Sequence, residues 1–166
     1  MKKWIYSIIV GLFILSGCNT DKATPAQQTT DSETHDGHTH TNGDLREETA
    51  NKDTLPTFLD GADENIQLTY QVAAYATDIL EYMPCYCGCG ESVGHRNNLD
   101  CFIHEIREDG SIVWDDHGTR CTVCLEIALQ SAKMVQDGMD LKEIRNAIDE
   151  QYKEGYATPT DTKIPA

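Results

Sequence analysis

Six cysteines fall within forty residues of this chain, and they constrain its fold more than any other feature. Three alternate with other residues in one short loop, a fourth follows the loop, and a Cys-x-x-Cys pair closes the group: Cys85, Cys87, Cys89, Cys101, Cys121 and Cys124. Alternate side chains of an extended backbone face the same way, so the three sulfurs of the loop converge. Cysteines two residues apart do not readily form a disulfide, because the bond needs suitable Cα separation and opposed Cβ vectors.

Three interpretations of these sulfurs stay open. The first is a soft-metal site, because thiolates select Zn(II) or Cu(I) and six sulfurs suit a closed site plus a disulfide or a small thiolate cluster. The second is a set of up to three structural disulfides. The third is a thiol–disulfide carrier that works through Cys121 and Cys124. A helix N-terminus and Arg120 lower the pKa of thiols there, which predicts that these two are the thiolates.

Two histidines lie close in sequence to the sulfurs and are candidate ligands or hydrogen-bond partners of ligands. His95 follows Cys89 by six residues, and His117 precedes Cys121 by four. An ordinary surface or hydrogen-bonded imidazole is the alternative for each. No pattern indicates a nucleophile with a base and an oxyanion site, so the sequence favours a binding protein over an enzyme.

The first eighteen residues have the pattern of a lipoprotein signal peptide. Lys2 and Lys3 precede a mostly apolar stretch at 4–15, which is too short to span a bilayer. The stretch ends in Leu15-Ser16-Gly17-Cys18, which resembles the bacterial lipobox. The resemblance implies cleavage after residue 17, a lipid on Cys18 and anchoring to the extracytoplasmic face of the cell membrane. It also accounts for the odd number of seven cysteines.

Composition divides the rest of the chain. Between Asn19 and Leu55 the only large apolar residues are Leu45 and Leu55, too few to offset the entropy of ordering. We therefore expect a lipid-anchored disordered tether at 18–55, a cysteine-rich domain at 56–157 and a disordered tail at 158–166. The tether also holds three histidines, which either bind a divalent metal weakly or are solvated; they are His35, His38 and His40.

The pattern of the domain predicts a mainly α fold, a small three-helix domain with a Cys-rich loop and a short β-hairpin. Apolar spacing predicts helices at 63–83, at 119–136 and from Asp140 to Gly155, where Asp140 and Glu143 make a capping-box pattern. Strands at 100–106 and 111–114 flank an Asp-Gly turn. A helix over 99–107 is the alternative to the first strand.

The formal net charge is −15, which excludes a nucleic-acid or polybasic lipid-binding surface. Residues 56–166 hold twenty acidic and eight basic side chains, so the domain itself suits attracting a cation.

The run Met83-Pro84-Cys85-Tyr86-Cys87-Gly88-Cys89-Gly90 resembles the signature of the bacterial PCYCGC-motif lipoproteins. The likeness extends over about 71–156 and implies an anchored domain, in a family without a known activity. A shorter stretch, from Arg120 through Cys124 and the helices that follow, is similar to the thiol subunit of cytochrome c maturation. That likeness implies a redox pair, but the small domain of that subunit lacks the four other cysteines found here.

We therefore expect an extracytoplasmic lipoprotein whose six-cysteine domain binds copper or zinc for capture or delivery. Its partners would be the membrane, through the lipid on Cys18, and a metal-transport protein. Two alternatives remain. One is a thiol–disulfide carrier in cytochrome c or other thiol maturation, with a thiol-redox partner, and the other is a disulfide-stapled interaction module.

Overall fold

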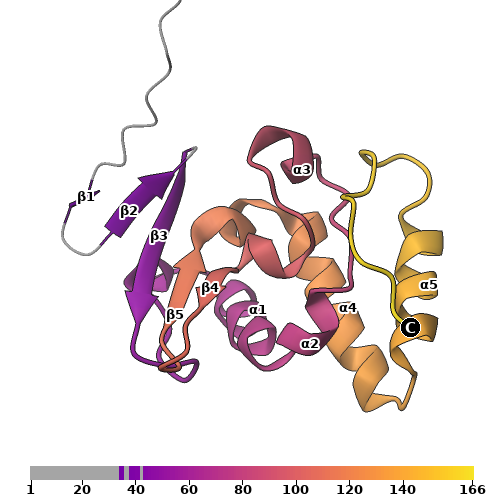
Figure 1. Cartoon of the computed structure of the whole chain (residues 1–166), viewed down its shortest axis with the longest axis horizontal. Coiled ribbons are helices and arrows are strands. Elements are labelled where there is room, and N and C mark those ends of the chain that lie inside the picture. The colour runs from indigo at the N-terminus through magenta and orange to yellow at the C-terminus, as the bar shows by residue number, and fades with distance from the viewer. Residues whose placement is uncertain (1–33, 36–37, 42) are drawn as a thin grey trace, which may run out of the picture.

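A computed structural model describes residues 34–35, 38–41 and 43–166 of the chain. The expected signal peptide and Cys18 lie outside the described residues. Figure 1 shows a twisted sheet at one end of the molecule and a layer of helices at the other. The loop that carries the first cysteines lies above the junction of the two layers. No helix in the described part of the chain is long and apolar enough to cross a membrane.

The sheet is larger than the predicted hairpin. Its strands are β1 (Thr34–His35), β2 (His38–Thr41), β3 (Asp44–Thr49), β4 (Ile103–Ile106) and β5 (Ile112–Asp115). They lie in the order β1-β2-β3-β5-β4, and every pair is antiparallel. The β4–β5 hairpin is confirmed, and Gly110 takes the left-handed conformation in its turn.

The prediction of a mainly α fold is wrong, because β3 adds the N-terminal segment to the sheet. Arg46 pairs with Asp115 and Thr49 with Ile112, so this part of the segment expected to be a tether belongs to the folded unit. Residues 18–33 of that segment lie outside the described residues. Polar side chains hold this strand. The Glu47 carboxylate accepts hydrogen bonds from the Thr57 amide at 2.7 and 2.8 Å, and Trp114 Nε1 donates to Thr49 Oγ1 at 2.8 Å. The fold is a mixture of helices and antiparallel sheet.

The helices follow the predicted order with one interruption. They are α1 (Glu64–Tyr75), α2 (Thr77–Leu80), α3 (Cys89–Ser92), α4 (Thr122–Gln136) and α5 (Leu141–Gln151). The helix expected over 63–83 is broken at Ala76, whose φ of −108° is not helical. The capping box of Asp140 and Glu143 at the start of α5 is confirmed. Short 3₁₀ turns at Thr57–Leu59, Leu99–Cys101 and Asp116–Arg120 are labelled η1, η2 and η3.

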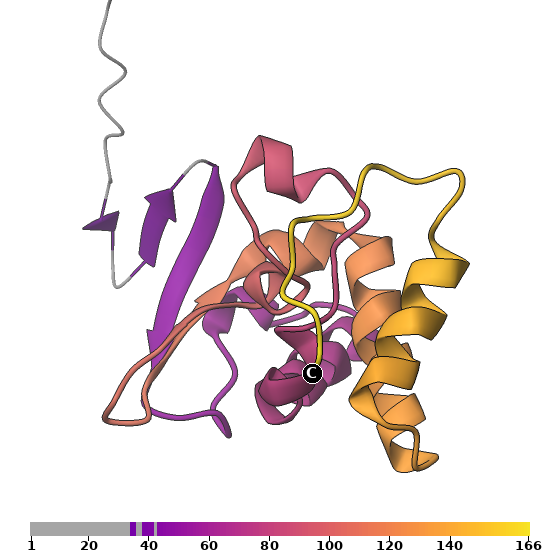
Figure 2. The same cartoon turned by 45° about the vertical axis from the view of Figure 1, so that its right-hand side comes forward.

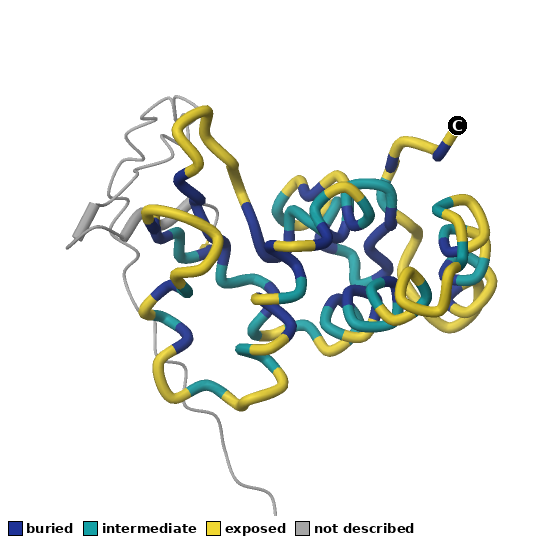
Figure 3. The backbone as a smooth tube through the Cα atoms, turned by 90° about the horizontal axis from the view of Figure 1, so that it is seen from below, coloured by how far each residue is buried: buried dark blue, intermediate teal, exposed yellow. Residues whose placement is uncertain are grey.

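Aromatic side chains join the helices to the sheet. Tyr70 of α1 packs edge-on against Phe102 with ring centroids 5.1 Å apart, and its hydroxyl donates to the Asp115 carbonyl. Ile127, Ile144 and other fully buried side chains fill the space between α4 and α5. In Figure 3 the buried stretches run through the middle of the tube and the exposed ones form its outer loops. This core fixes η2 and the start of α4, which carry three of the cysteines.

The tail expected to be disordered lies against the folded unit. Residues 157–162, here called the strap, run back along the cysteine loop (Figure 2). The amides of Ala157 and Thr160 donate to the carbonyls of Tyr86 and Cys85 at 3.0 and 3.1 Å. Hydrogen bonds, and not a pattern of apolar residues, hold the strap in place. A prediction based on apolar patterns therefore did not find its ordered structure.

Candidate metal centre

All six cysteines of the domain converge as free thiols. Cys85 and Cys87 lie in the loop over 84–90, here called the cysteine loop, and Cys89 begins α3 at its end. Cys101 is the last residue of η2, and Cys121 and Cys124 form the N-cap and first turn of α4. The structure thus brings together three segments that are separate in the sequence.

Three sulfurs form the buried centre of the group. The Sγ atoms of Cys85 and Cys124 are 3.0 Å apart, and Cys101 Sγ lies 3.3 Å from each of them. All three residues are fully buried. We call Cys85, Cys101 and Cys124 the sulfur triangle. Its ligand atoms are sulfurs alone, which is the donor set that Cu(I) and Zn(II) prefer.

Further sulfurs surround the triangle, and their separations from its sulfurs can be compared with those in metal sites. Cys87 Sγ lies 3.6 Å from Cys85 Sγ and 3.5 Å from Cys124 Sγ, and Cys89 Sγ lies 3.8 Å from Cys101 Sγ. In a tetrahedral zinc site with Zn–S bonds of about 2.3 Å, neighbouring sulfurs are about 3.8 Å apart. Cys121 groups with Cys87 and Cys124 within 4.8 Å. The separations of Cys87 and Cys89 from their neighbours therefore match shared metal coordination, whereas the sulfurs of the triangle lie closer together than in a metal-bound set.

Local packing holds this arrangement in place. The Asn98 amide nitrogen Nδ2 donates to the Cys124 carbonyl at 3.2 Å, and the Asn98 backbone amide donates to the Met83 carbonyl at 2.8 Å. Asn98 is fully buried, so it ties the cysteine loop to α4. A Cβ at Gly118 would meet the Phe102 ring at 2.6 Å, which shows how closely η3 packs on the segment that carries Cys101.

Both candidate histidines reach the sulfurs. His95 is buried, and its Nδ1 lies 3.4 Å from Cys101 Sγ. His117 Nδ1 lies 3.2 Å from Asp44 Oδ1, and a hydrogen bond with Cys87 is the main reason that the pKa of His117 is raised to about 9. The two imidazole rings meet edge to face, with centroids 4.8 Å apart.

The pKa values of the thiols divide the cysteines into two kinds. Hydrogen bonds from Cys121 and Cys124 lower the pKa of Cys87. Burial raises the pKa of Cys101, but hydrogen bonds from neighbouring thiols and from His95 outweigh it and lower the pKa. The remaining thiols in contact with Cys101 have raised pKa values, chiefly because of their hydrogen bonds with it; they are Cys85, Cys89 and Cys124.

The pKa values of Cys121 and Cys124 are raised, whereas the helix N-terminus predicted lowered ones. A hydrogen bond with Cys124 lowers the pKa of Cys121, but the hydrogen bond with Cys87 and burial together raise it to about 11. The Arg120 guanidinium bonds Asp44 and Asp116 instead of supporting the thiols. The two thiols whose pKa values are lowered, Cys87 and Cys101, each lie beside an imidazole.

The sequence pattern of one protein family matches residues 7–165. That family is described as a protein of unknown function with PCYCGC motif. The chain belongs to it. No curated protein and no solved structure matches the chain, so the cytochrome c maturation likeness gains no support.

The geometry gives most letters of the PCYCGC motif a role. The first cysteine of the motif, Cys85, belongs to the triangle, and the second, Cys87, lies at its edge. The tyrosine between them points the other way. Tyr86 stacks on Tyr152, the residue that caps the C-terminus of α5, with ring centroids 5.4 Å apart, and its hydroxyl donates to Asp149 at 2.7 Å. Gly88 has a φ of +87°, a conformation that side chains disfavour, and it turns the chain into α3 so that Cys89 faces inward.

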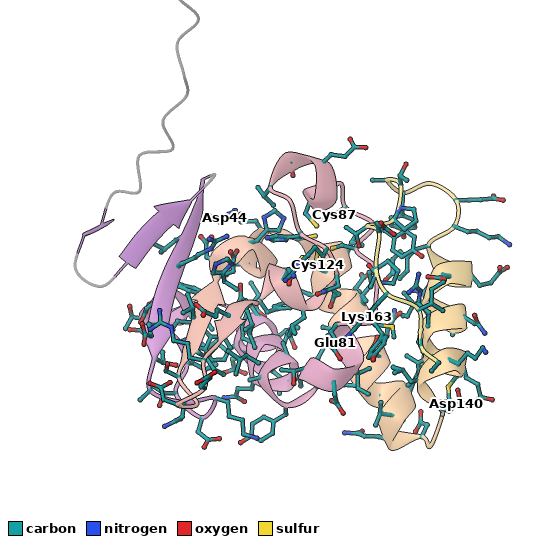
Figure 4. The ribbon with its side chains drawn as sticks, in the orientation of Figure 1. Asp44, Glu81, Cys87, Cys124, Asp140 and Lys163 are labelled. Carbon is teal, nitrogen blue, oxygen red and sulfur yellow. The ribbon has the colours of Figure 1, made fainter. Side chains whose placement is uncertain are left out.

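Sequence reasoning missed a polar residue of the sheet that contacts one of the candidate histidines. Asp44, at the start of β3, contacts His117 and also accepts from Arg120 Nη2 at 2.6 Å. Figure 4 shows Asp44 at the end of the sheet that lies nearest the cysteine loop, with Cys87 and Cys124 beside it toward the helices. Nothing near Asp44 in the sequence marks it, because its partner lies 73 residues away.

Proposed function

We propose that this protein is a membrane-anchored extracytoplasmic lipoprotein whose six-cysteine domain binds a soft metal ion, Cu(I) or Zn(II), for capture or delivery. The sulfur triangle is the observation that carries the proposal. Three fully buried thiols meet at 3.0–3.3 Å, an arrangement that gives soft ions all-sulfur coordination. Cys87 supplies a fourth sulfur from the edge of the group, which completes the number that zinc requires.

The same geometry argues against the two alternatives. A thiol–disulfide carrier that works through Cys121 and Cys124 needs one of these two thiols to be accessible with a lowered pKa, whereas Cys124 is fully buried and the pKa of Cys121 is raised to about 11. A disulfide-stapled module separates its cysteines into pairs, whereas here Cys85 and Cys101 each contact several other sulfurs. One converging group is better suited to a metal than to either form of disulfide chemistry.

Capture and delivery require that an ion can pass between proteins. Two cysteines at the edge of the site are accessible enough to allow such a transfer. Cys87 and Cys121 are only half-buried, so a thiol of a metal-transport partner can reach an ion held there and replace one ligand at a time. The lipid on Cys18 would keep this exchange at the membrane. The acidic domain, with an excess of twelve negative side chains, would raise the local cation concentration.

Metal titration tests the proposal. The chain from residue 19 onward is reduced, kept anaerobic and titrated with Cu(I) or Zn(II), and bound metal and free thiols are counted by native mass spectrometry. We expect tight stoichiometric binding that Cys124→Ser weakens strongly and Thr122→Ala leaves unchanged, because Thr122 lies between the two cysteines of α4 but is exposed. Six blocked thiols without metal in freshly isolated protein would contradict the proposal.

A further inference from the structure

A second group of ligands lies beside the sulfur triangle. Cys89, His95 and His117 offer one sulfur and two imidazole nitrogens that all lie within 4.8 Å of one another. We propose that these three residues form a separate metal site of mixed ligands, which binds a divalent ion of the borderline class such as Zn(II). We call it the imidazole site. Its only sulfur, Cys89, lies at the margin of the thiol group, 3.8 Å from Cys101.

The donor set separates the two sites chemically. Imidazole suits divalent zinc, copper and nickel, whereas sulfur-only sites select softer ions. Three protein ligands leave a fourth position of a tetrahedral ion open to water or to an incoming ligand, as in zinc sites that exchange what they bind. The chain thus offers a buried sulfur site and, next to it, a site for an ion that prefers a different set of ligands.

The surroundings of His117 are those of a metal ligand. Its Nδ1 faces Asp44 Oδ1 at 3.2 Å, which leaves Nε2 as the nitrogen directed away from the carboxylate. A carboxylate behind the imidazole fixes the tautomer and the orientation of the ring, an arrangement that recurs behind metal-bound histidines. Arg120 Nη2 holds the same carboxylate oxygen at 2.6 Å, so Asp44 is itself oriented.

Asp44 provides independent support for cation binding at this site. Its side chain is 4 % exposed, yet Oδ2 has no hydrogen-bond partner among the described residues. A buried carboxylate oxygen without a partner is costly, and a cation nearby reduces that cost. Asp115, the other acid near His95, has both oxygens engaged, one by Arg46 Nε and one by the His117 amide. It supports the site without serving as a ligand.

The packing of His95 explains why the two sites adjoin. His95 is 7 % exposed, its ring meets that of His117 edge to face, and its Nδ1 lies 3.4 Å from Cys101 of the triangle. Two imidazoles and a thiol therefore share one enclosed space at the border of the sulfur group. The inference rests on the proposed function in taking these thiols to be reduced, but it does not depend on which metal the triangle holds.

Sequential loading of the whole chain from residue 19 onward tests the imidazole site. The reduced protein is first saturated with Cu(I) under anaerobic conditions, and Co(II) is then added as a spectroscopic substitute for Zn(II). We expect one equivalent of Co(II) with visible bands of tetrahedral geometry and a near-ultraviolet band from the Cys89 thiolate. His95→Gln and His117→Gln should each abolish the visible bands and weaken Co(II) binding about tenfold or more, while Cu(I) stoichiometry stays unchanged.

Matched variants keep the outcome decisive. Asp44→Asn removes the carboxylate behind His117 but no ligand, and should weaken Co(II) binding by about 10–100-fold. His104→Gln, an exposed histidine of β4, should change nothing. Co(II) bands that survive both His95→Gln and His117→Gln, or wild-type protein that binds no Co(II), would overturn the inference. Failure of the proposed function appears separately, as absence of Cu(I) binding in the first titration.

Discussion

Thr160 holds the backbone of Cys85 on both of its polar groups. Its hydroxyl oxygen accepts from the Cys85 amide at 2.9 Å, and its own amide donates to the Cys85 carbonyl at 3.1 Å. Cys85 contacts three other sulfurs, so its position sets the geometry of the whole group. The strap is therefore a part of the metal centre, although it contributes no ligand.

Replacing the Thr160 hydroxyl should loosen the site. Thr160→Val keeps the shape of the side chain but leaves the buried Cys85 amide without its acceptor, which costs about 1–3 kcal/mol. We expect a lower free energy of unfolding of the metal-free chain by denaturant titration, together with weaker metal binding. Thr158→Val, on the exposed part of the strap, is the control. Equal stability of the two variants would show that the strap does not support Cys85.

The close approach of the strap also explains Gly90. A Cβ at this position would lie 2.9 Å from Thr160 Cγ2 and 3.3 Å from the His95 carbonyl oxygen. Gly90→Ala should therefore destabilise the protein by about 1–3 kcal/mol through overpacking. Adding Thr160→Ser removes the clashing methyl but keeps the hydroxyl, so the double variant should recover part of the lost stability. A double variant no more stable than Gly90→Ala would place the cost elsewhere, at the His95 carbonyl.

Local sequence patterns predicted the parts of the fold that depend on local chemistry. The Asp-Gly turn between β4 and β5 and the capping box at Asp140 follow from the preferences of single residues, and both are present. The two helices after Cys121 also follow from apolar spacing. The convergence of three sulfurs in the cysteine loop was expected from their alternation, and the structure extends it to all six.

The parts that were missed depend on polar contacts between distant residues. The inward positions of β3 include Asp44, Glu47 and Thr49, which gain their partners only in the folded chain. A hydrophobicity pattern reads such a strand as a tether. The pKa values of Cys121 and Cys124 differ from the expectation for a related reason, because hydrogen bonds between sulfurs outweigh the effect of the helix N-terminus.

Cys121 and Cys124 should differ sharply when each is replaced by serine. Cys124 belongs to the buried triangle, so Cys124→Ser should weaken Cu(I) binding beyond the 10–100-fold that outer-shell changes typically cost. Cys121 is half-buried and caps α4, its sulfur accepting from the Cys124 amide at 3.3 Å. Serine is a good N-cap, so Cys121→Ser should keep the stability of the metal-free chain and weaken metal binding less. Competition with a chromogenic Cu(I) chelator measures both affinities, and a larger loss in Cys121→Ser than in Cys124→Ser would contradict this order.

The raised pKa of His117 predicts a pH dependence of the metal-free fold. The hydrogen bond with Cys87 is the main cause, with Asp44 contributing, and the folded pKa of about 9 exceeds the ordinary value of 6.5. A group whose pKa is raised on folding contributes its full stabilisation of the folded state below about pH 6.5. This contribution is lost as the pH rises through 9. We expect the free energy of unfolding of the reduced, metal-free chain to fall between pH 6.5 and 9.

His117→Gln provides the control for this pH dependence, because glutamine does not titrate. Denaturant titrations of both proteins at pH 6, 7.5 and 9 should show a slope in the wild type that is largely absent from the variant. Asp44→Asn should give an intermediate slope, since it removes only a secondary cause of the raised pKa. Parallel curves for all three proteins would mean that the imidazole of His117 is not held as the charged partner of Cys87.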